Sequence, residues 1–308
     1  MSFRKEERMQ LQDRVAIVTG AGGGLGRTHA LFLASKGARI VVNDVSADQA
    51  EVVAQEIREA GGAAMALPGS VTDEVAIGAG VAAVLSAWGR IDILINNAGI
   101  LRDKSFAKMT MADFRTVVDV HLMGAAICSH AVWEPMREQR HGRIVMTTSS
   151  SGLYGNFGQA NYGAAKMALV GLMQTLAIEG AKYGIRVNAL APTAATQMTH
   201  GVLPDDSLLR LDPALVSNGL LALTGDAAPT RAILCAGGGH FAVANITLTE
   251  GAYIGDGADA AERLIERWDD VSDRSRDTVP EYGFFQAERE VTSARNAAQQ
   301  DEAAKSAA

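Results

Sequence analysis

Short, uninterrupted apolar runs alternate with longer segments of helical period between residues 14 and 255. A run without polar alternation predicts a strand covered on both faces, because a half-exposed strand would alternate apolar and polar side chains. The predicted strands are residues 15–19, 39–43, 63–67, 91–95, 143–148, 185–190 and 241–248. Strands separated by helices form right-handed βαβ units. The pattern therefore predicts an α/β fold: a doubly wound parallel sheet of about seven strands with helices on both faces.

Capping residues and glycines set the limits of the predicted helices. Ser46 and Gln49 form a capping-box pair at the start of a helix over residues 47–60, which closes at two glycines. Thr110 caps a long helical stretch. That stretch is expected to break near Pro135, since proline removes a backbone N–H and clashes with the preceding turn.

The same pattern predicts one main domain followed by an extension. Nothing between residues 14 and 255 has the composition of a linker, so we expect a single domain over residues 1–268. Residues 193–225 are less periodic and follow the end of a strand, where ligand sites form in such sheets, so we expect them to cover a substrate. Residues 269–308 are polar and are expected to form a mobile C-terminal extension.

Composition and charge exclude several classes of protein. The 308 residues are 48% hydrophobic and 20% charged, which excludes a disordered chain. With 28 basic and 35 acidic residues the formal net charge is −7, so no nucleic-acid partner is expected. Cys128 and Cys235 lack metal-ligand spacing, so we expect no metal site and a reducing compartment. The chain opens with no signal-like segment and no apolar run reaches about 18 residues, so we expect a cytoplasmic protein with no membrane partner.

A glycine-rich turn, TGAGGGLG at residues 19–26, joins the first predicted strand to the first helix. Glycines allow a tight turn and a close approach to a pyrophosphate, whose charge lies at the helix N-terminus. Asp44 ends the second strand, where a carboxylate accepts hydrogen bonds from the adenosine ribose and repels a 2′-phosphate. No Arg or Lys follows it, so NAD is favoured over NADP. A plain tight turn and a solvated Asp44 are the alternative interpretations.

Three motifs together resemble the short-chain dehydrogenases/reductases. They are the glycine turn, NNAG at residues 96–99, and the set Ser149, Tyr162 and Lys166, in the order and at the spacings of that family. The resemblance covers nearly all of residues 10–255. It implies a Rossmann-type fold that oxidises a secondary alcohol with NAD. A dinucleotide sensor or scaffold without catalysis is the alternative from another class, although such a protein would be expected to have lost Tyr162 or Lys166.

A closer similarity links the chain to the (3R)-hydroxyacyl-CoA dehydrogenase module of the peroxisomal multifunctional β-oxidation enzyme. NNAGILRDKSFAKMT, YGNFGQANYGAAK and LAIEGAKYGIRVNALAP carry it, and it extends from about residue 13 to 260. It implies oxidation of a (3R)-hydroxyacyl-CoA to a 3-oxoacyl-CoA. We expect a stand-alone dehydrogenase, because nothing here resembles the hydratase and sterol-carrier modules. The family relationship also implies a homodimer or homotetramer.

The chemistry expected of Ser149, Tyr162 and Lys166 follows from their types and spacing. Tyr162 and Lys166 are four residues apart on a predicted helix, so their side chains share one face. A nearby ammonium is expected to lower the pKa of the tyrosine, which is otherwise near 10. Ser149 follows the fifth strand and would hold the substrate oxygen. Tyr162 would then take the alcohol proton while a hydride leaves for NAD⁺.

The resemblance also implies the remaining cofactor contacts. They would come from Gly20, Gly24, Leu25, Gly26, Asp44, Asn97, Ala98, Gly99, Tyr162, Lys166 and Pro192. Asn96 is expected to support the backbone beside the cofactor. His121 occupies the place of a family Asn whose backbone carbonyl holds a relay water, so we expect His121 in the proton relay, with a core histidine as the alternative. Two positions depart from the family pattern: Ser70 replaces a frequent Asp near the adenine, and Thr193 replaces a glycine after Pro192.

Candidate substrate contacts follow the same motifs. Arg102, Lys104 and Lys108 come after NNAG and are candidates for binding an anionic acyl-CoA, with a solvated loop as the alternative. Leu153, Phe157 and Met198, together with Ser149, are candidates for the substrate pocket; core packing is the competing explanation for the three apolar residues. Two other enzyme readings are oxidation of a steroid, terpenoid or other bulky secondary alcohol, and NADPH-linked 3-oxoacyl carrier-protein reduction, which Asp44 disfavours.

Overall fold

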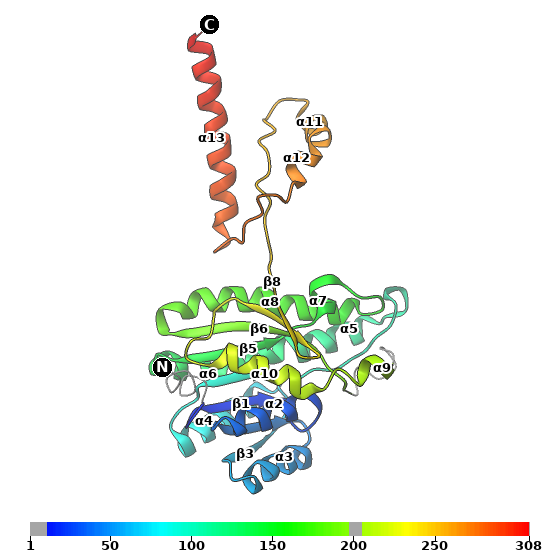
Figure 1. The fold of residues 1–308 in the computed structure, drawn as a ribbon, viewed down its shortest axis with the longest axis vertical. Helices are drawn as coiled ribbons and strands as arrows, with labels where there is room; N and C mark the ends of the chain where they lie inside the picture. Colours follow the sequence, from blue (N-terminus) through cyan, green and yellow to red (C-terminus); the bar gives the residue numbers. More distant parts are fainter. Residues whose placement is uncertain (1–10, 197–204, 308) are drawn as a thin grey trace. The chain divides into compact units, whose positions relative to one another are not determined.

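The computed structural model describes residues 11–196 and 205–307, and its first compact unit ends at Ala244. This unit contains one eight-stranded sheet in the order β3-β2-β1-β4-β5-β6-β7-β8 (Figure 1). Strands β1 to β7 are parallel, and β8 runs antiparallel to β7. The predicted doubly wound sheet is confirmed. The strands are β1 Val15–Thr19, β2 Arg39–Asp44, β3 Ala64–Pro68, β4 Ile93–Asn96, β5 Gly142–Thr147, β6 Ile185–Thr193, β7 Ile233–Gly237 and β8 His240–Ala244.

Helices cover both faces of this sheet, which explains why its strands lack polar alternation. Val15 and Ile17 belong to a core shared with α4, α6 and α8, whereas Ala16 and Val18 belong to a core shared with α2, α3 and α10. The helices of the unit are α2 Gly24–Ser35, α3 Ala47–Glu59, α4 Glu74–Trp88, α5 Met111–Val118, α6 Gly124–Gln139, α7 Ser150–Tyr154, α8 Ala160–Gly180, α9 Asp205–Leu208 and α10 Pro213–Thr224. Shorter helical turns are η1 Phe106–Lys108, η2 Asp119–Met123 and η3 Ala181–Tyr183.

The prediction of the last strand was right only in part, because residues 241–244 belong to strand β8 but residues 245–248 do not, and β7 was missed. Residues 241–248 were expected to form one strand, but the structure has a hairpin of β7 and β8 joined by Gly238 and Gly239. Both glycines have positive φ, +58° and +78°, as a two-residue hairpin turn requires. The apolar run of β7 is short and ends in glycines, so its sequence resembles a loop.

Two further expectations need correction. Residues 213–224 of the expected covering segment form the regular helix α10, whose Val216, Leu220 and Leu223 are buried in the core. The helical stretch also continues through Pro135 to Gln139, since the buried side chains around it keep the last turn packed on the sheet.

Residues 111–139 form a continuous helical stretch that is long and apolar enough to cross a membrane by length and composition alone. This differs from the expectation that no segment reaches membrane length. Here Ala125, Cys128, Val132 and Met136 of the stretch are buried in the sheet's core, as in a core helix. The apolar composition therefore has an explanation in packing.

The second compact unit comprises residues 245–308 and is described by itself. Leu248 and Thr278 exchange two backbone hydrogen bonds, and Arg289 donates to the carbonyl of Thr249 at 2.7 Å. The boundary expected at residues 268/269 therefore lies inside this unit instead of at its start. The unit also contains helices that were not predicted from the sequence: α11 Ala260–Glu266, α12 Trp268–Ser272 and α13 Phe284–Ala307.

Candidate active site

The glycine turn lies where the strand order reverses, between β1 and β4, at the carboxyl edge of the sheet. Ligands of open α/β sheets bind at this point. Gly20 and Gly24 have φ of +60° and +51°, and a Cβ on Gly26 would lie 2.1 Å from the carbonyl oxygen of Gly20. Gly23 precedes α2 without a side-chain cap, so the first N–H groups of the helix are available to an anion. The turn fits a pyrophosphate.

Asp44 is fixed at the end of β2 beside this turn. One carboxylate oxygen accepts a hydrogen bond from the N–H of Gly22 at 2.9 Å, and the other accepts from the N–H of Ser46 at 3.0 Å. Each oxygen retains a lone pair, and the side chain is only half-buried. Asp44 can therefore accept from the two hydroxyls of a ribose without moving.

The NNAG segment supports the glycine turn from β4. Asn97 Nδ2 donates to the carbonyls of Thr19 and Gly20 at 2.9 and 3.2 Å. Thr19 Oγ1 in turn accepts from the N–H groups of Asn97 and Ala98, both at 3.0 Å. Thr19 was not singled out from the sequence, although it is the first residue of the TGAGGGLG motif. Asn96 is buried and donates to Ser129 at 3.0 Å, in a supporting position.

Ser149, Tyr162 and Lys166 come together at the ends of β5 and α8. The Lys166 side chain is buried, its Nζ donates to the carbonyl of Thr147 at 2.6 Å, and it lies 5.5 Å from the centroid of the Tyr162 ring. Ser149 begins α7, and its Oγ accepts from the N–H of Ser151 at 3.2 Å. The three residue types therefore form one cluster at the carboxyl edge of the sheet, as a hydroxyl-handling site requires.

The charges in this cluster differ from the expectation. Burial raises the pKa of Tyr162 above 10, although the hydrogen bond with Ser149 lowers it in part and the charge of Asp103 raises it further. Burial also lowers the pKa of Lys166 to about 7. The expected lowering of the Tyr162 pKa by Lys166 is therefore not found, because burial disfavours the charged form of each group.

His121 lies in the same cluster, in the π-helical turn η2. Its ring meets that of Tyr162 edge to face, with centroids 5.3 Å apart and planes at 87°. Burial, followed by the positive charge of Lys166, lowers the pKa of His121 to about 3. The imidazole is therefore neutral at ordinary pH.

The candidate substrate residues are less closely grouped. Arg102 and Lys104 lie 4.0 and 3.8 Å from carboxylate oxygens of Asp113, so neither is a free cation, whereas Lys108 is exposed at the end of η1. Leu153 packs against the core, and Phe157 is 90% exposed. Met198 lies outside the described residues, and Pro192 is half-buried in β6 opposite Ala236.

Two segments form one rim beside Tyr162. The N–H of Lys104 donates to the carbonyl of Gly158 at 2.9 Å, and Gln159 Nε2 donates to Asp103 at 2.6 Å. Asn161 Nδ2 adds a bond to the carbonyl of Arg102 at 3.1 Å. Phe157, next to Gly158 in this rim, is exposed. Phe106 of η1 and Tyr154 of α7 are also exposed, and sequence analysis did not identify either of them.

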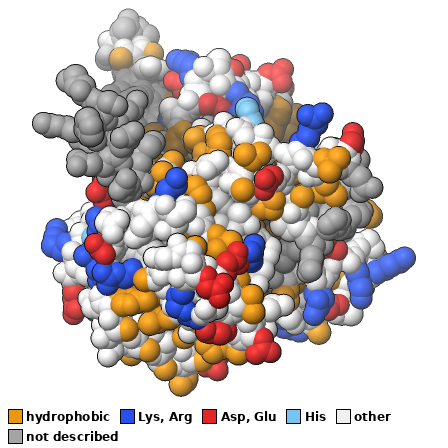
Figure 2. All heavy atoms as spheres, turned by 60° about the horizontal axis from the view of Figure 1, so that its bottom comes forward, with side chains coloured by type: hydrophobic (Ala, Val, Ile, Leu, Met, Phe, Trp, Pro, Cys, Tyr) orange, Lys and Arg blue, Asp and Glu red, His pale blue; other side chains and the backbone are white. Residues whose placement is uncertain are grey.

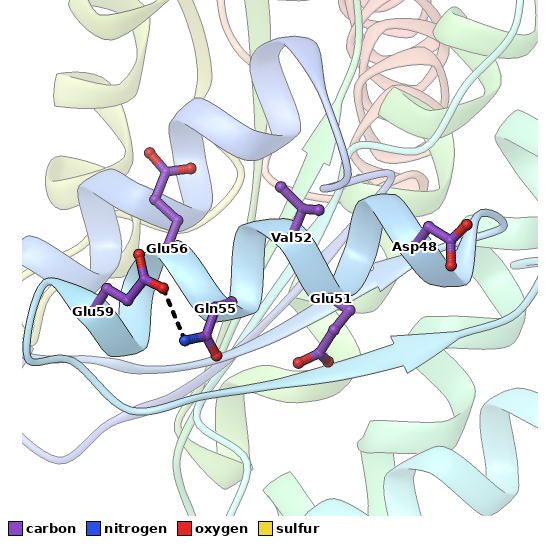
Figure 3. A pocket seen from close by; sticks show the side chains of 6 residues that line it. All are labelled: Asp48, Glu51, Val52, Gln55, Glu56 and Glu59. Atoms are coloured by element: carbon purple, nitrogen blue, oxygen red, sulfur yellow. Dashed lines mark hydrogen bonds between the residues drawn. The ribbon is translucent and has the colours of Figure 1, made fainter.

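The rest of the described surface offers no rival site of comparable chemistry. Figure 2 shows basic and acidic side chains interspersed on one face, without a field of a single sign. A hollow of about 570 Å³ lies on the outer face of α3 and is lined mainly by acidic side chains (Figure 3). Three of its four carboxylates have local partners: Glu51 pairs with Arg58, Glu56 with Arg27, and Glu59 with Gln55. Within residues 11–196 and 205–307, His, Cys, Asp and Glu side chains form no group of three suited to a metal.

Comparison with known proteins agrees with this geometry. The profile of the short chain dehydrogenase family matches residues 14–207. The peroxisomal hydratase-dehydrogenase-epimerase of Saccharomyces cerevisiae is 50% identical over 228 residues, which are 70% of this chain and 25% of that protein. The chain thus spans about a quarter of that relative. The full-length peroxisomal multifunctional enzyme type 2 of Drosophila melanogaster has a similar structure, with a TM-score of 0.76 and 37% identity, covering 91% of this chain and 48% of that one.

A third similar structure bears on the cofactor. It is a 7α-hydroxysteroid dehydrogenase complexed with NADH and 7-oxo glycochenodeoxycholic acid, with a TM-score of 0.70 and 32% identity, covering 76% of this chain and 96% of that one. The glycine turn of this chain, with its open helix N-terminus, fits a nicotinamide dinucleotide. By profile, motif order and fold, the chain belongs to the short-chain dehydrogenase family, and it is an oxidoreductase that acts on CH–OH groups.

Proposed function

We propose that this protein oxidises a (3R)-hydroxyacyl-CoA to the 3-oxoacyl-CoA with NAD⁺. The observation that carries the proposal is the cluster of Ser149, Tyr162 and Lys166 at the sheet edge that also holds the glycine turn and Asp44. The similarity to enzymes named peroxisomal hydratase-dehydrogenase-epimerase and multifunctional enzyme type 2 supports the substrate class.

The residues divide the reaction between them. NAD⁺ supplies the acceptor for the hydride that leaves the alcohol carbon. Ser149 holds the alcohol oxygen, and the phenolate of Tyr162 takes the hydroxyl proton, so that the C–O bond becomes a carbonyl. Because burial raises the pKa of Tyr162, the phenolate is the minor form at neutral pH. Oxidation should therefore accelerate as the pH rises, whereas reduction needs the protonated tyrosine.

Preference for NAD over NADP is supported by the charges around Asp44. Its carboxylate is held toward the glycine turn by Gly22 and Ser46, where it would repel a 2′-phosphate. Arg27, on the neighbouring helix α2, is engaged by Glu56, with guanidinium–carboxylate distances of 3.1 and 2.7 Å. Its charge is therefore already partnered and offers little to a phosphate.

An apolar substrate chain is supported by the rim beside Tyr162. Phe157 stands almost fully in solvent, which costs free energy unless a ligand or partner covers it. Burying one methylene against such a side chain contributes about 0.8 kcal/mol. We expect Phe157→Ala to flatten the dependence of KM on acyl-chain length and to leave the thermal midpoint unchanged.

A bulky steroid alcohol is the second candidate, favoured by the 7α-hydroxysteroid dehydrogenase among the similar structures. Formation of reduced cofactor should be followed with NAD⁺ or NADP⁺ and a panel of (3R)- and (3S)-hydroxyacyl-CoAs of graded length and of hydroxysteroids. Turnover of the (3R) thioesters with NAD⁺ supports the proposal. Turnover of steroids alone would retain the chemistry and overturn the acyl-CoA assignment, and turnover of (3S) thioesters would overturn the stereochemistry.

We further propose a homodimer or homotetramer built on the outer face of α8. Met167 and Ile178 on this helix are 38% and 48% exposed, and Gly171 between them leaves the face flat. An apolar stripe at helical spacing suits packing against the same helix of a second copy. Light scattering of the wild type and of Met167→Glu should show a multimer that the charge weakens; a monomeric wild type would overturn the proposal.

A further inference from the structure

Three contacts of different kinds converge on the side chain of His121. The residue lies in η2, the π-helical turn between α5 and α6, and only 2% of its surface is exposed. Such turns inside helices occur frequently at functional sites. The family resemblance assigned this position a role for its backbone, so the contacts of the imidazole itself need a separate explanation.

The first two contacts join the ring to the segment that follows β4. A Cβ on Gly99 would lie 2.2 Å from Cε1 of His121, so the imidazole packs directly on the glycine backbone. Nε2 lies 3.0 Å from the nitrogen and 2.8 Å from the oxygen of Ile100. A neutral ring nitrogen either accepts from the N–H or donates to the carbonyl, so Nε2 keeps one bond to Ile100 in either tautomer.

The third contact joins the ring to the catalytic tyrosine. The rings of His121 and Tyr162 meet edge to face, with centroids 5.3 Å apart. This arrangement is favourable for aromatic pairs and restricts the plane of the phenol. Because proton transfer needs the phenol oxygen within hydrogen-bond reach of the alcohol, a shift of about 1 Å can cost about a hundredfold in rate.

The surroundings keep the imidazole in one charge state. Lys166 of α8 lies beside it with an amine that is only partly protonated at neutral pH, because burial lowers its pKa to about 7, and Tyr162 of the same helix faces it as a neutral phenol. The Nδ1 atom is buried and contacts no hydrogen-bonding atom within the described part of the chain. A second cation in this place would be unfavourable beside Lys166, so the ring acts through shape and hydrogen bonding.

We propose that the His121 side chain is a positioning residue of the reaction: it is anchored on the backbone of Gly99 and Ile100 and sets the orientation of the Tyr162 ring that it meets edge to face. This inference rests on the dehydrogenase activity of the site but not on the acyl-CoA substrate. It predicts that the ring and the hydrogen bond of His121 are both needed, because one sets the plane of the phenol and the other fixes the ring itself.

Two substitutions separate these contributions. His121→Asn keeps a polar group for Ile100 and removes the ring that contacts Tyr162, whereas His121→Phe keeps a ring and removes the hydrogen bond. His29→Asn is the matched control, since His29 is equally buried but bonds to Ser217 at 2.7 Å, between α2 and α10. Kinetics with NAD⁺ and (3R)-hydroxybutyryl-CoA are compared with thermal midpoints of the same samples.

We expect both His121 variants to lose about tenfold to about a hundredfold in kcat with little change in KM, up to the cost of displacing the phenol by about 1 Å. The His29 variant should lose thermal stability and keep its kcat. If the His121 variants lose only stability, or if the control loses kcat equally, the residue has a merely structural role and the proposal is overturned.

A second readout needs no substrate. Tyrosinate absorbance on alkaline titration, taken as the difference from Tyr162→Phe in the same background, reports the ionisation of Tyr162 alone. His121→Ala should admit water beside the phenol and move its pKa down toward its ordinary value, because burial is what raises it. An unchanged titration would overturn the proposal. Absence of turnover with the thioester would count against the proposed substrate instead, and this titration would still decide the role of His121.

Discussion

The carboxylate of Asp44 and the backbone of Gly22 fit each other closely. The N–H of Gly22 donates to Oδ2 at 2.9 Å, and a Cβ on Gly22 would lie 2.9 Å from that same oxygen. A side chain at residue 22 would clash with this carboxylate, so glycine leaves the space that Asp44 occupies beside the turn. The contact couples the phosphate turn after β1 to the ribose position at the end of β2.

Replacing Asp44 should change cofactor choice. In Asp44→Ala the ribose loses a charged acceptor and a 2′-phosphate loses a repelling charge. A hydrogen bond to a charged group contributes about 1.5–3 kcal/mol, so kcat/KM for NAD⁺ should fall by about tenfold to about a hundredfold. The ratio of kcat/KM values for NAD⁺ and NADP⁺ is the measurement. Asp48→Ala, on the exposed face of α3, is the control, and an unchanged ratio in Asp44→Ala would contradict the role of the acid.

Removing the hydroxyl of Tyr162 should abolish catalysis without emptying the cofactor site. In Tyr162→Phe the alcohol proton has no acceptor, so kcat should fall by about 10²–10⁴-fold. Fluorescence titration with NADH should give nearly the wild-type affinity. A protein that serves only as a dinucleotide sensor would show no functional difference in this variant. Tyr183→Phe, on η3 away from the cluster, is the control.

The pH profile of the wild type offers a separate prediction. Burial raises the pKa of Tyr162 above 10, so the fraction of phenolate grows with pH throughout the range in which the fold persists. The kcat for oxidation should therefore rise with pH and the kcat for reduction should not. A bell-shaped oxidation profile centred near neutrality would contradict the assignment of Tyr162 as the base.

The sequence predicted the elements of this fold where local patterns decide them. Uninterrupted apolar runs gave β1 to β6, because strands buried on both faces need no polar positions. The run of β7 was too short, and its glycines too similar to a loop, to show that it pairs with β8. The core position of α10 was also missed, since only the complete sheet supplies the surface that buries Leu220.

The candidate site was likewise predictable from the sequence only in part. Motif spacing brought Ser149, Tyr162 and Lys166 together, because four residues on a helix and the end of a strand are local relations. Two other relations join segments far apart in the chain. They are the support of the glycine turn by the hydrogen bonds of Thr19 and the edge-to-face contact of His121 with Tyr162. The pKa directions were not predictable either, because they depend on how much water the finished fold excludes.

A buried ionic cluster at the opposite edge of the sheet should carry much stability. Asp92 is fully buried, accepts from the N–H of Val15 at 2.9 Å and pairs with Arg14 and Arg90. Burial alone would raise its pKa, but these partners keep it below the usual value. Asp92→Asn leaves Arg14 and Arg90 without their carboxylate, but both guanidiniums are partly hydrated, so it should lower the free energy of unfolding by about 1–3 kcal/mol.

Urea unfolding at neutral pH measures the effect of Asp92→Asn. The exposed Asp226, which also pairs with Arg14, is the control, and Asp226→Asn should cost about 1 kcal/mol or less. Because the pKa of Asp92 is lower in the folded state, its contribution is present above the unfolded-state pKa and is lost as the pH falls through the folded-state value. Equal losses in the two variants would contradict the importance of burial.

The buried Lys166 should lower the free energy of unfolding, although the activity requires it. Its pKa falls from 10.5 unfolded to about 7 folded, so between these values the unfolded chain binds the extra proton and stability rises with pH. At neutral pH the free-energy cost of burying Lys166 exceeds the stabilisation from its hydrogen bond to Thr147, which Lys166→Met also removes. We therefore expect Lys166→Met to be inactive yet more stable by about 1–3 kcal/mol near pH 7. This gain should diminish as the pH approaches 10, where the wild-type penalty disappears. Urea unfolding of both proteins across this range shows whether the variant gains or loses stability. A variant less stable at every pH would show that the folded state does not disfavour the charged form of Lys166.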